Sequence, residues 1–312
     1  ANGNGLLGNS SSTSSAIIVP KPCSETEYYI FALGALGGSL SYSLVDMDDN
    51  QDCYISSNEN GKVVLSSKNI NLPGPTGEKI CAIKKANNQD YWVIATKMNT
   101  NEFYVYEVTE LGVIPMSIQN VGPIIRVYGY LKGSPSGSSL AMASSPFSGS
   151  GNGTVELYDF DKTNGMIMHK QTIIPNRQVV YGIEFSENES YLFFSCYDGS
   201  NLTQNAKEIY RYDFINSSLT LIYTSPDILP NMSYSNLGAL QLNPNRSKIL
   251  IAKGRTQFLD AIDDPNNGGI YIADDVQLNN MSFLGLPTFV SGCVDRCKPL
   301  DMVNYRQAVP DL

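Results

Sequence analysis

The sequence predicts an all-β protein with a β-propeller fold, and three observations lead to this prediction. An apolar or aromatic residue precedes Gly129, Gly182 and Gly238, which follow one another at steps of 53 and 56 residues. A second short apolar segment follows each glycine, and Tyr-Asp-Phe recurs at 158–160 and 212–214. No long stretch shows the 3.6-residue apolar period of a helix. Short strands repeated at about 50 residues are typical of a radially repeated architecture.

The individual elements follow this pattern along the chain. Residues 1–15 are rich in Gly, Asn and Ser and predict a loop or a loosely held arm. The propeller is expected to span 16–290, and the polar segment 291–312 is expected to be a tail. About five four-stranded blades are recognisable, which irregular or missing sequence could complete to six or seven. Besides the three repeats, the predicted strands are 16–19, 28–31, 40–45, 61–65, 78–83, 90–95, 102–108, 269–273 and 283–290.

Composition and charge narrow the range of partners. Charged residues make up 16% of the chain and the net charge is −9, without any Lys/Arg run. A nucleic-acid or anionic-membrane partner would need a clustered basic face, so neither is expected. The longest apolar run, 16–19, has the length of a strand, so no membrane insertion is expected.

Two acidic clusters have the oxygen-rich spacing that calcium prefers. Both fall in predicted connections between strands, where a solvated turn is the alternative reading. The first departs from the helix–loop–helix calcium motif, since Ser57 stands where that motif has a bidentate Glu. Calcium is therefore the one cofactor considered. The candidate ligands are Asp46, Asp48, Asn50 and Asp52 in the first cluster, and Asp260, Asp263 and Asp264 in the second.

The cysteines and the glycosylation sequons are candidates for disulfides and attached glycans. Six cysteines form no zinc-binding pattern, so disulfides of unknown pairing or buried thiols are the two readings. The sequons fall mostly at predicted turns, where glycans would fit. The cysteines are Cys23, Cys53, Cys81, Cys196, Cys293 and Cys297, and the sequons begin at Asn9, Asn152, Asn188, Asn201, Asn216, Asn231, Asn245 and Asn280.

Catalytic motifs are weak. A Ser–His–Asp arrangement would have to use His169, which sits on a predicted outer strand, and no G-x-S-x-G motif is present. Paired carboxylates for glycoside cleavage can come from distant blades. Glu78, Glu184 and Asp213 are the acids that the sequence singles out for such a role.

An ordered set of segments resembles a region of large secreted proteins of the Bacteroidetes. The set comprises 2–22, 28–31, 42–46, 78–80, 90–94, 129–143 and 284–289. The resemblance implies a β-propeller-like region, which in that family often precedes adhesion-type repeats and a C-terminal sorting domain for type IX secretion. The family's region begins before the equivalent of Asn2, and this chain has no sorting domain. The chain is therefore expected to be a fragment, a processed product, or a relative in another genome such as a virus.

These features together predict a secreted, non-enzymatic β-propeller that serves as a binding or assembly module. The expected partner is a protein or a glycan on a cell, filament or virion surface, with adhesion or scaffolding as the role. One alternative is an extracellular propeller enzyme that acts on polysaccharide. Another is a self-assembling fibre subunit, in which the arm (1–15) or the tail (291–312) docks on the next copy and gives a homo-oligomer.

Overall fold

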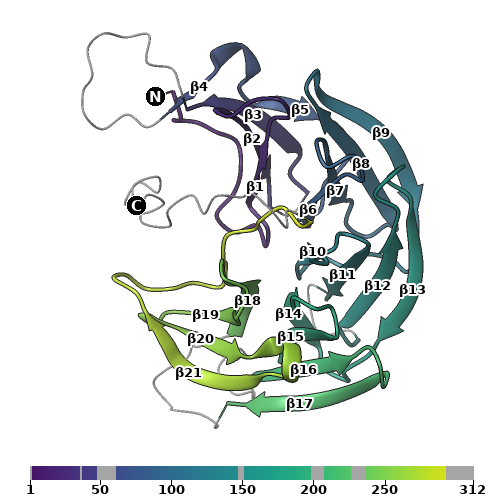
Figure 1. The fold of residues 1–312 in the computed structure, drawn as a ribbon, viewed down its shortest axis with the longest axis vertical. Coiled ribbons are helices and arrows are strands. Elements are labelled where there is room, and N and C mark those ends of the chain that lie inside the picture. Colours follow the sequence, from purple (N-terminus) through teal and green to yellow (C-terminus); the bar gives the residue numbers. More distant parts are fainter. Residues whose placement is uncertain are drawn as a thin grey trace.

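The computed structural model describes residues 2–35, 37–47, 61–146, 151–197, 207–225 and 237–292. Within these residues the chain is an all-β, five-bladed propeller, and the blades follow one another around an axis in chain order (Figure 1). In each blade the strands pair antiparallel, from an inner strand near the axis to an outer strand at the rim. The predicted fold class and the count of about five blades are confirmed.

The strand bounds explain how the sequence pattern maps onto blades. Blade 1 is irregular, because its two short outer strands both pair with β3. Its strands are β1 (Ala16–Pro20), β2 (Glu27–Leu33), β3 (Leu40–Asp46), β4 (Lys62–Val63) and β5 (Ile70–Leu72). Blade 2 has β6 (Ile80–Lys84), β7 (Tyr91–Thr96), β8 (Glu102–Thr109) and β9 (Gly112–Asn120); blade 3 has β10 (Leu131–Gly133), β11 (Ser139–Ser144), β12 (Thr154–Phe160) and β13 (Ile167–Ile173). Blade 4 has β14 (Val179–Phe185), β15 (Tyr191–Tyr197), β16 (Lys207–Asp213) and β17 (Ser218–Thr224); blade 5 has β18 (Leu237–Leu242), β19 (Lys248–Lys253), β20 (Phe258–Asp263) and β21 (Ile270–Gln277).

The turn after the inner strand is the same in blades 2 to 5. In each, one residue adopts a left-handed conformation with φ between 57° and 76°, and its N–H donates to the carbonyl three residues earlier. A tight turn that ends in a left-handed residue is a common way to connect two antiparallel strands. The turn ends each inner strand at the same level along the axis. The left-handed residues are Asn88, Gly137, Glu189 and Arg246.

Buried apolar side chains pack between the blades. In the described part of the chain they form four clusters, and none lies between blades 5 and 1. Three clusters each lie between two consecutive blades, and the fourth lies between blades 3 and 4 and extends to Ala239 and Ala252 of blade 5. Large aromatic rings recur in these clusters because neighbouring sheets stack face to face and leave a wide wedge to fill. Representative members are Phe31 with Tyr104, Trp92 with Tyr158, Leu157 with Phe194, and Phe193 with Ile251.

The glycines that mark the repeat lie where backbones come closest. A Cβ on Gly182 would stand 2.1 Å from the carbonyl oxygen of Gly238 in the next blade, and a Cβ on Gly238 would stand 2.3 Å from that of Leu284. Gly129 has φ +104°, and its Cβ would meet the Ala143 carbonyl oxygen of its own blade at 2.5 Å. Only a residue without a side chain fits such contacts. The period in the sequence therefore reflects crowding around the axis.

The segment 283–292 occupies the position between blades 5 and 1. The Ala239 N–H donates to the Leu284 carbonyl at 2.8 Å. Further along, the segment forms parallel bridges with Ile17 in blade 1 and, through Ser291, with Ile83 in blade 2. Figure 1 shows this segment crossing from blade 5 toward β1 and β6. It connects the last blade to the first two in place of a direct blade-to-blade core.

The structure also places the predicted arm and the predicted last strand. Residues 2–15 lie along blade 1, where Lys68 donates to the Asn2 carbonyl at 3.0 Å and Asn69 donates to the Gly5 carbonyl at 2.8 Å. The described part of the arm thus packs on its own domain. The predicted strand 283–290 contributes to the inner wall of the ring, and the rest of the predicted tail after 292 lies outside the described residues.

We expect Gly182→Ala to lower the free energy of unfolding by about 1–3 kcal/mol, because the added methyl group overlaps the Gly238 carbonyl. Urea unfolding followed by circular dichroism measures this loss. Gly3→Ala is the matched control, since nothing lies within 4 Å of a Cβ there. Equal stability of the two variants would show that the close approach tolerates a side chain.

Candidate functional site

Polar and charged side chains gather at both ends of the inner strands. The inner strands of all blades begin at one end of the axis and end at the other, because each blade repeats the same strand order. One cluster surrounds Glu78 and Lys79, just before β6. The other joins Lys132, Glu184 and Gln241 near the ends of β10, β14 and β18. The two clusters differ in the groups that form hydrogen bonds and ion pairs with their charged side chains.

Glu78 is a buried carboxylate at the beginning of an inner strand. Its side chain is 2% exposed. The backbone N–H and the hydroxyl of Thr13 both donate to its Oε2 at 2.9 Å. Two donors on one oxygen hold the carboxylate in a fixed orientation and offset part of the cost of burying it.

Tyr128 and Tyr181 stand close to Glu78, and a third tyrosine, Tyr197, stands close to these two. Burial raises the pKa of Tyr128, and the negative charge of Glu78 raises it further. Burial raises the pKa of Tyr181 to about 12, although a hydrogen bond with Thr13 acts in the opposite direction. Burial also raises the pKa of Tyr197, and electrostatic interactions with Tyr181 and Tyr128 raise it further. All three phenols therefore keep their protons at neutral pH and are able to donate hydrogen bonds.

Lys79 holds the connection between blades 2 and 3. Its side chain is 1% exposed, and its Nζ donates to the carbonyls of Val127, Tyr128 and Gly129 at 3.2, 2.6 and 2.7 Å. Burial lowers the pKa of Lys79 to about 7, while the charge of Glu78 acts in the opposite direction. Lys79 thus fixes the backbone that carries Tyr128, and its ammonium is already occupied by carbonyls.

At the other end of the axis, charges neutralise one another. Lys132 lies 3.1 Å from Glu184 Oε2 and donates to Gln241 Oε1 at 2.6 Å. The Leu242 N–H also donates to Glu184, at 3.2 Å. A buried ion pair is tolerated when its remaining hydrogen bonds are also made. Side chains that are paired in this way have few donors or acceptors left for a substrate. We assign this cluster to joining blades 3, 4 and 5.

The three acids that the sequence singled out are not brought together. Glu78 precedes β6, whereas Glu184 is the next-to-last residue of β14, so the two lie at opposite ends of the axis. Asp213 ends β16 and accepts hydrogen bonds from the backbone of Ile215 and Asn216 within its own turn. Of the three, only Glu78 lies beside tyrosine hydroxyls.

The carboxylates of the second predicted calcium cluster each interact with different residues. Asp260 accepts from Lys253, from the Tyr271 hydroxyl and from the Asp274 N–H. Asp263 lies near Lys248, and Asp264 accepts from Asn267. In the described residues no group of three or more His, Cys, Asp or Glu side chains could hold a metal ion. Of the first cluster, Asp46 ends β3, while Asp48, Asn50 and Asp52 lie outside the described residues.

The described cysteines lie in different blades and are not joined by disulfides. Cys23 is exposed in the first turn of blade 1, whereas Cys81 and Cys196 are buried in separate clusters. Burial raises the pKa of the Cys81 thiol, which makes it unreactive. Cys53, Cys293 and Cys297 lie outside the described residues, so the prediction of disulfides stays a prediction.

The remaining predicted residues are on the surface or on outer strands. His169 lies on β13 as predicted, 2.9 Å from Glu156, and no serine completes a triad through the contacts of its ring. The six described sequon asparagines are exposed, which fits glycosylation without testing it. They are Asn9, Asn152, Asn188, Asn216, Asn245 and Asn280; Asn201 and Asn231 lie outside the described residues. No helix in the described chain is long and apolar enough to span a membrane.

The sequence analysis missed Lys79, Tyr128, Tyr181, Tyr197 and Lys132. One signal for Lys132 was available: Lys132, Glu184 and Gln241 each stand two residues before the carbonyl that closes the turn after their inner strand. A polar residue repeated at that place in apolar strands predicts side chains that meet at one level of the axis. No comparable signal marks Tyr197, which ends a middle strand.

Comparison with solved structures finds other propellers. A periplasmic gluconolactonase of Pseudomonas aeruginosa is 12% identical, with a TM-score of 0.49 over 82% of this chain and 70% of that one. A luciferin-regenerating enzyme is 14% identical, with a TM-score of 0.49 over 88% and 79%. The Dos1 propeller is 11% identical, with a TM-score of 0.49 over 82% and 67%. No family model and no curated protein matches the chain.

These neighbours correct one prediction. The sequence predicted a non-enzymatic binding or assembly module, and this is contradicted by the comparison, in which two of the three propellers just described are named as enzymes. At this level of similarity the likeness transfers neither an activity nor a substrate, and the propeller fold rests on the blades of this structure. The resemblance to secreted Bacteroidetes proteins is not tested by the comparison.

We expect Lys79 to add a pH dependence to stability between about pH 7 and pH 10. The folded pKa of about 7 lies below the ordinary value of 10.5, so in this window the unfolded chain binds a proton that the folded chain has released. Stability therefore rises with pH here, by up to about 1.4 kcal/mol per pH unit, and the gain is lost again as the pH falls from 10 to 7.

The measurement is the free energy of unfolding of the natural chain minus that of Lys79→Met, from urea titrations between pH 6 and pH 9. Because both chains contain the same tyrosines and cysteines, the difference removes the contribution that their titration makes to the pH dependence. It should rise with pH. A flat difference would mean that the Lys79 amine titrates at its ordinary pKa in the folded protein.

Proposed function

We propose that the chain is a propeller enzyme that hydrolyses an ester bond of a carbohydrate-derived substrate, a sugar lactone in the simplest case. The reaction takes place at the Glu78 end of the axis. The observation that carries this proposal is a buried, oriented carboxylate beside two protonated tyrosines, Tyr128 and Tyr181.

The roles follow from the chemistry of ester hydrolysis. The Glu78 carboxylate takes a proton from water as the water oxygen attacks the ester carbonyl, which is general-base catalysis. Tyr128 and Tyr181 donate hydrogen bonds to the oxygen on which negative charge develops. Their raised pKa values keep these donors protonated well above neutral pH. The tetrahedral intermediate then collapses, the C–O bond to the alcohol breaks, and Glu78 returns its proton to the leaving oxygen, which restores the carboxylate. Lys79 fixes Tyr128 through the backbone of residues 127–129.

An ester suits this arrangement better than a glycosidic bond. Glycoside hydrolysis commonly uses two carboxyl groups about 5–10 Å apart on either side of the scissile bond. Here Glu184 is paired with Lys132 at the opposite end of the axis. One carboxylate with hydrogen-bond donors is sufficient to hydrolyse an ester.

Two observations are consistent with a location outside the cytoplasm, and we include this location in the proposal. The described sequon asparagines are exposed, and one of the similar propellers is a periplasmic protein. That protein is named a gluconolactonase, a reaction of the class proposed here, but the proposal rests on Glu78.

We expect the purified chain to hydrolyse at least one member of a panel of sugar lactones and acetylated saccharides, followed by proton release at constant pH. Glu78→Gln keeps the shape and the hydrogen bonds from Thr13 but removes the base, so kcat/KM should fall about 100-fold or more. Adding polysaccharides to the panel and scoring reducing ends tests glycosidic cleavage in the same experiment.

Glu102→Gln is the matched control. Glu102 also lies in blade 2 and also accepts a hydrogen bond from a tyrosine, Tyr104, at 2.7 Å, but it stands away from the axis at the start of β8. This variant should hydrolyse the panel like the natural chain. Absence of hydrolysis across the panel, or full activity of Glu78→Gln, would rule out the proposed role.

A further inference from the structure

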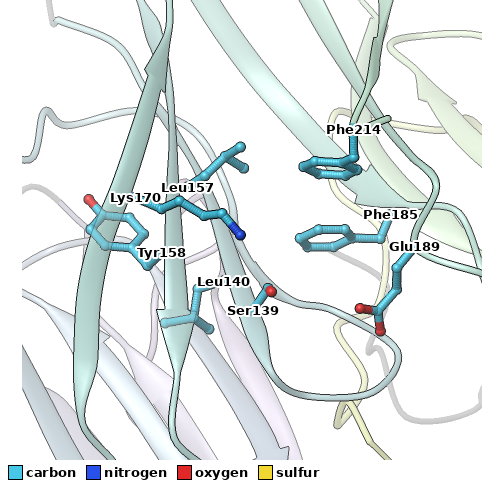
Figure 2. A pocket seen from close by; sticks show the side chains of 8 residues that line it. All are labelled: Ser139, Leu140, Leu157, Tyr158, Lys170, Phe185, Glu189 and Phe214. Carbon is cyan, nitrogen blue, oxygen red and sulfur yellow. The ribbon is translucent and has the colours of Figure 1, made fainter. Parts of the chain in front are cut away.

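A second pocket lies between blades 3 and 4, apart from the axial site. Its volume is about 200 Å³. Leu140 and Leu157 come from the middle strands of blade 3, while in blade 4 Phe185 ends β14 and Phe214 directly follows β16. Figure 2 shows the space between the blade 3 strands and the two phenylalanine rings. A cavity of this size would hold one small molecule.

The aromatic wall presents ring edges to the cavity. Phe185 and Phe214 are stacked, with ring centroids 6.1 Å apart and planes 12° apart. Figure 2 shows both rings edge-on, with one edge of each turned toward Leu157 and Lys170. The edge of an aromatic ring carries partial positive charge, whereas its face is negative. This wall therefore favours a negatively charged or electron-rich group over a cation.

Polar groups on the blade 3 side add to this preference. The Lys170 ammonium extends into the space in front of the rings, and the Ser139 hydroxyl lies below it (Figure 2). Lys170 lies 3.2 Å from Asp159, but an ammonium has three N–H donors, so a second partner fits. The carboxylate of Glu189 accepts from the Ser136 N–H instead of pairing with Lys170.

We propose that this pocket binds a small carboxylate with a flat apolar body, such as an aromatic or alicyclic acid. The carboxylate accepts hydrogen bonds from Lys170 and Ser139, and the apolar body packs between Leu157 and the edges of Phe185 and Phe214. A saccharide suits the pocket less well, because sugars stack on the face of an aromatic ring and only edges are presented here.

The probe for this proposal is benzoate, with benzamide as its uncharged equivalent of the same shape. Saturation-transfer NMR and calorimetry on the full chain should show saturable benzoate binding with a Kd of about 1 mM. Benzamide should bind at least fivefold more weakly. Lys170→Met, which removes the charge but keeps the length of the side chain, should weaken benzoate binding at least fivefold.

Two control variants test whether benzoate binds in this pocket. Lys97→Met removes another solvent-accessible lysine that is paired with an acid, Glu102, in blade 2, and it should leave benzoate affinity unchanged. Glu78→Gln should also leave it unchanged, which separates this pocket from the axial site. The proposal is overturned by three results: no saturable binding, equal affinity for benzamide, or sensitivity to Glu78→Gln without sensitivity to Lys170→Met.

Discussion

Crowding around the axis is the constraint on which the rest of the structure depends. The backbones of blades 4 and 5 approach so closely that no side chain fits at Gly182 or Gly238. Polar atoms in this region still need partners, and Ser195 supplies them by accepting from the Gly182 N–H and donating to the Gly238 carbonyl at 2.9 Å each. Larger polar side chains, such as Glu78 and Glu184, are found near the two ends of the inner strands.

The two ends of the axis solve the burial of charge in different ways. At one end, Lys132 and Glu184 neutralise each other, and their ion pair joins two blades. At the other, the Lys79 ammonium is held by backbone carbonyls and the Glu78 carboxylate by Thr13. The Glu78 carboxylate is thus oriented by the donors of Thr13 and lies beside tyrosine hydroxyls. This difference is why we assign the function to the Glu78 end.

The sequence was a good guide to elements that repeat. The glycine steps and the alternation of short apolar segments predicted the propeller and its five blades, because crowding and burial act on each blade alike. It was a poor guide to which residues of different blades come into contact. Glu78 and Glu184 look equivalent as acids near inner strands, but the level of a residue along its strand depends on where the following turn closes.

Segment 283–292 was visible in the sequence as an apolar stretch, but its role could not be predicted from local pattern. Its Leu284-Gly285 pair matches the Leu237-Gly238 pair that opens blade 5, and the repeat therefore continues one step beyond the last complete blade. Phe283 and Phe289 remain 69% and 43% exposed, which no strand propensity would indicate. The parallel bridges to Ile17 and Ile83 show that the segment lies against the first two blades.

The position of this segment has a consequence for how the protein assembles. On a ribosome the blades emerge one after another, and each can dock on its predecessor through one of the four clusters. The contacts that tie blade 5 to Ile17 and Ile83 come from residues made after all five blades. The ring therefore stays an open arc during most of its synthesis. Joining its two ends is a late, long-range step, and the speed of that step depends on how well the partly built arc holds its curvature.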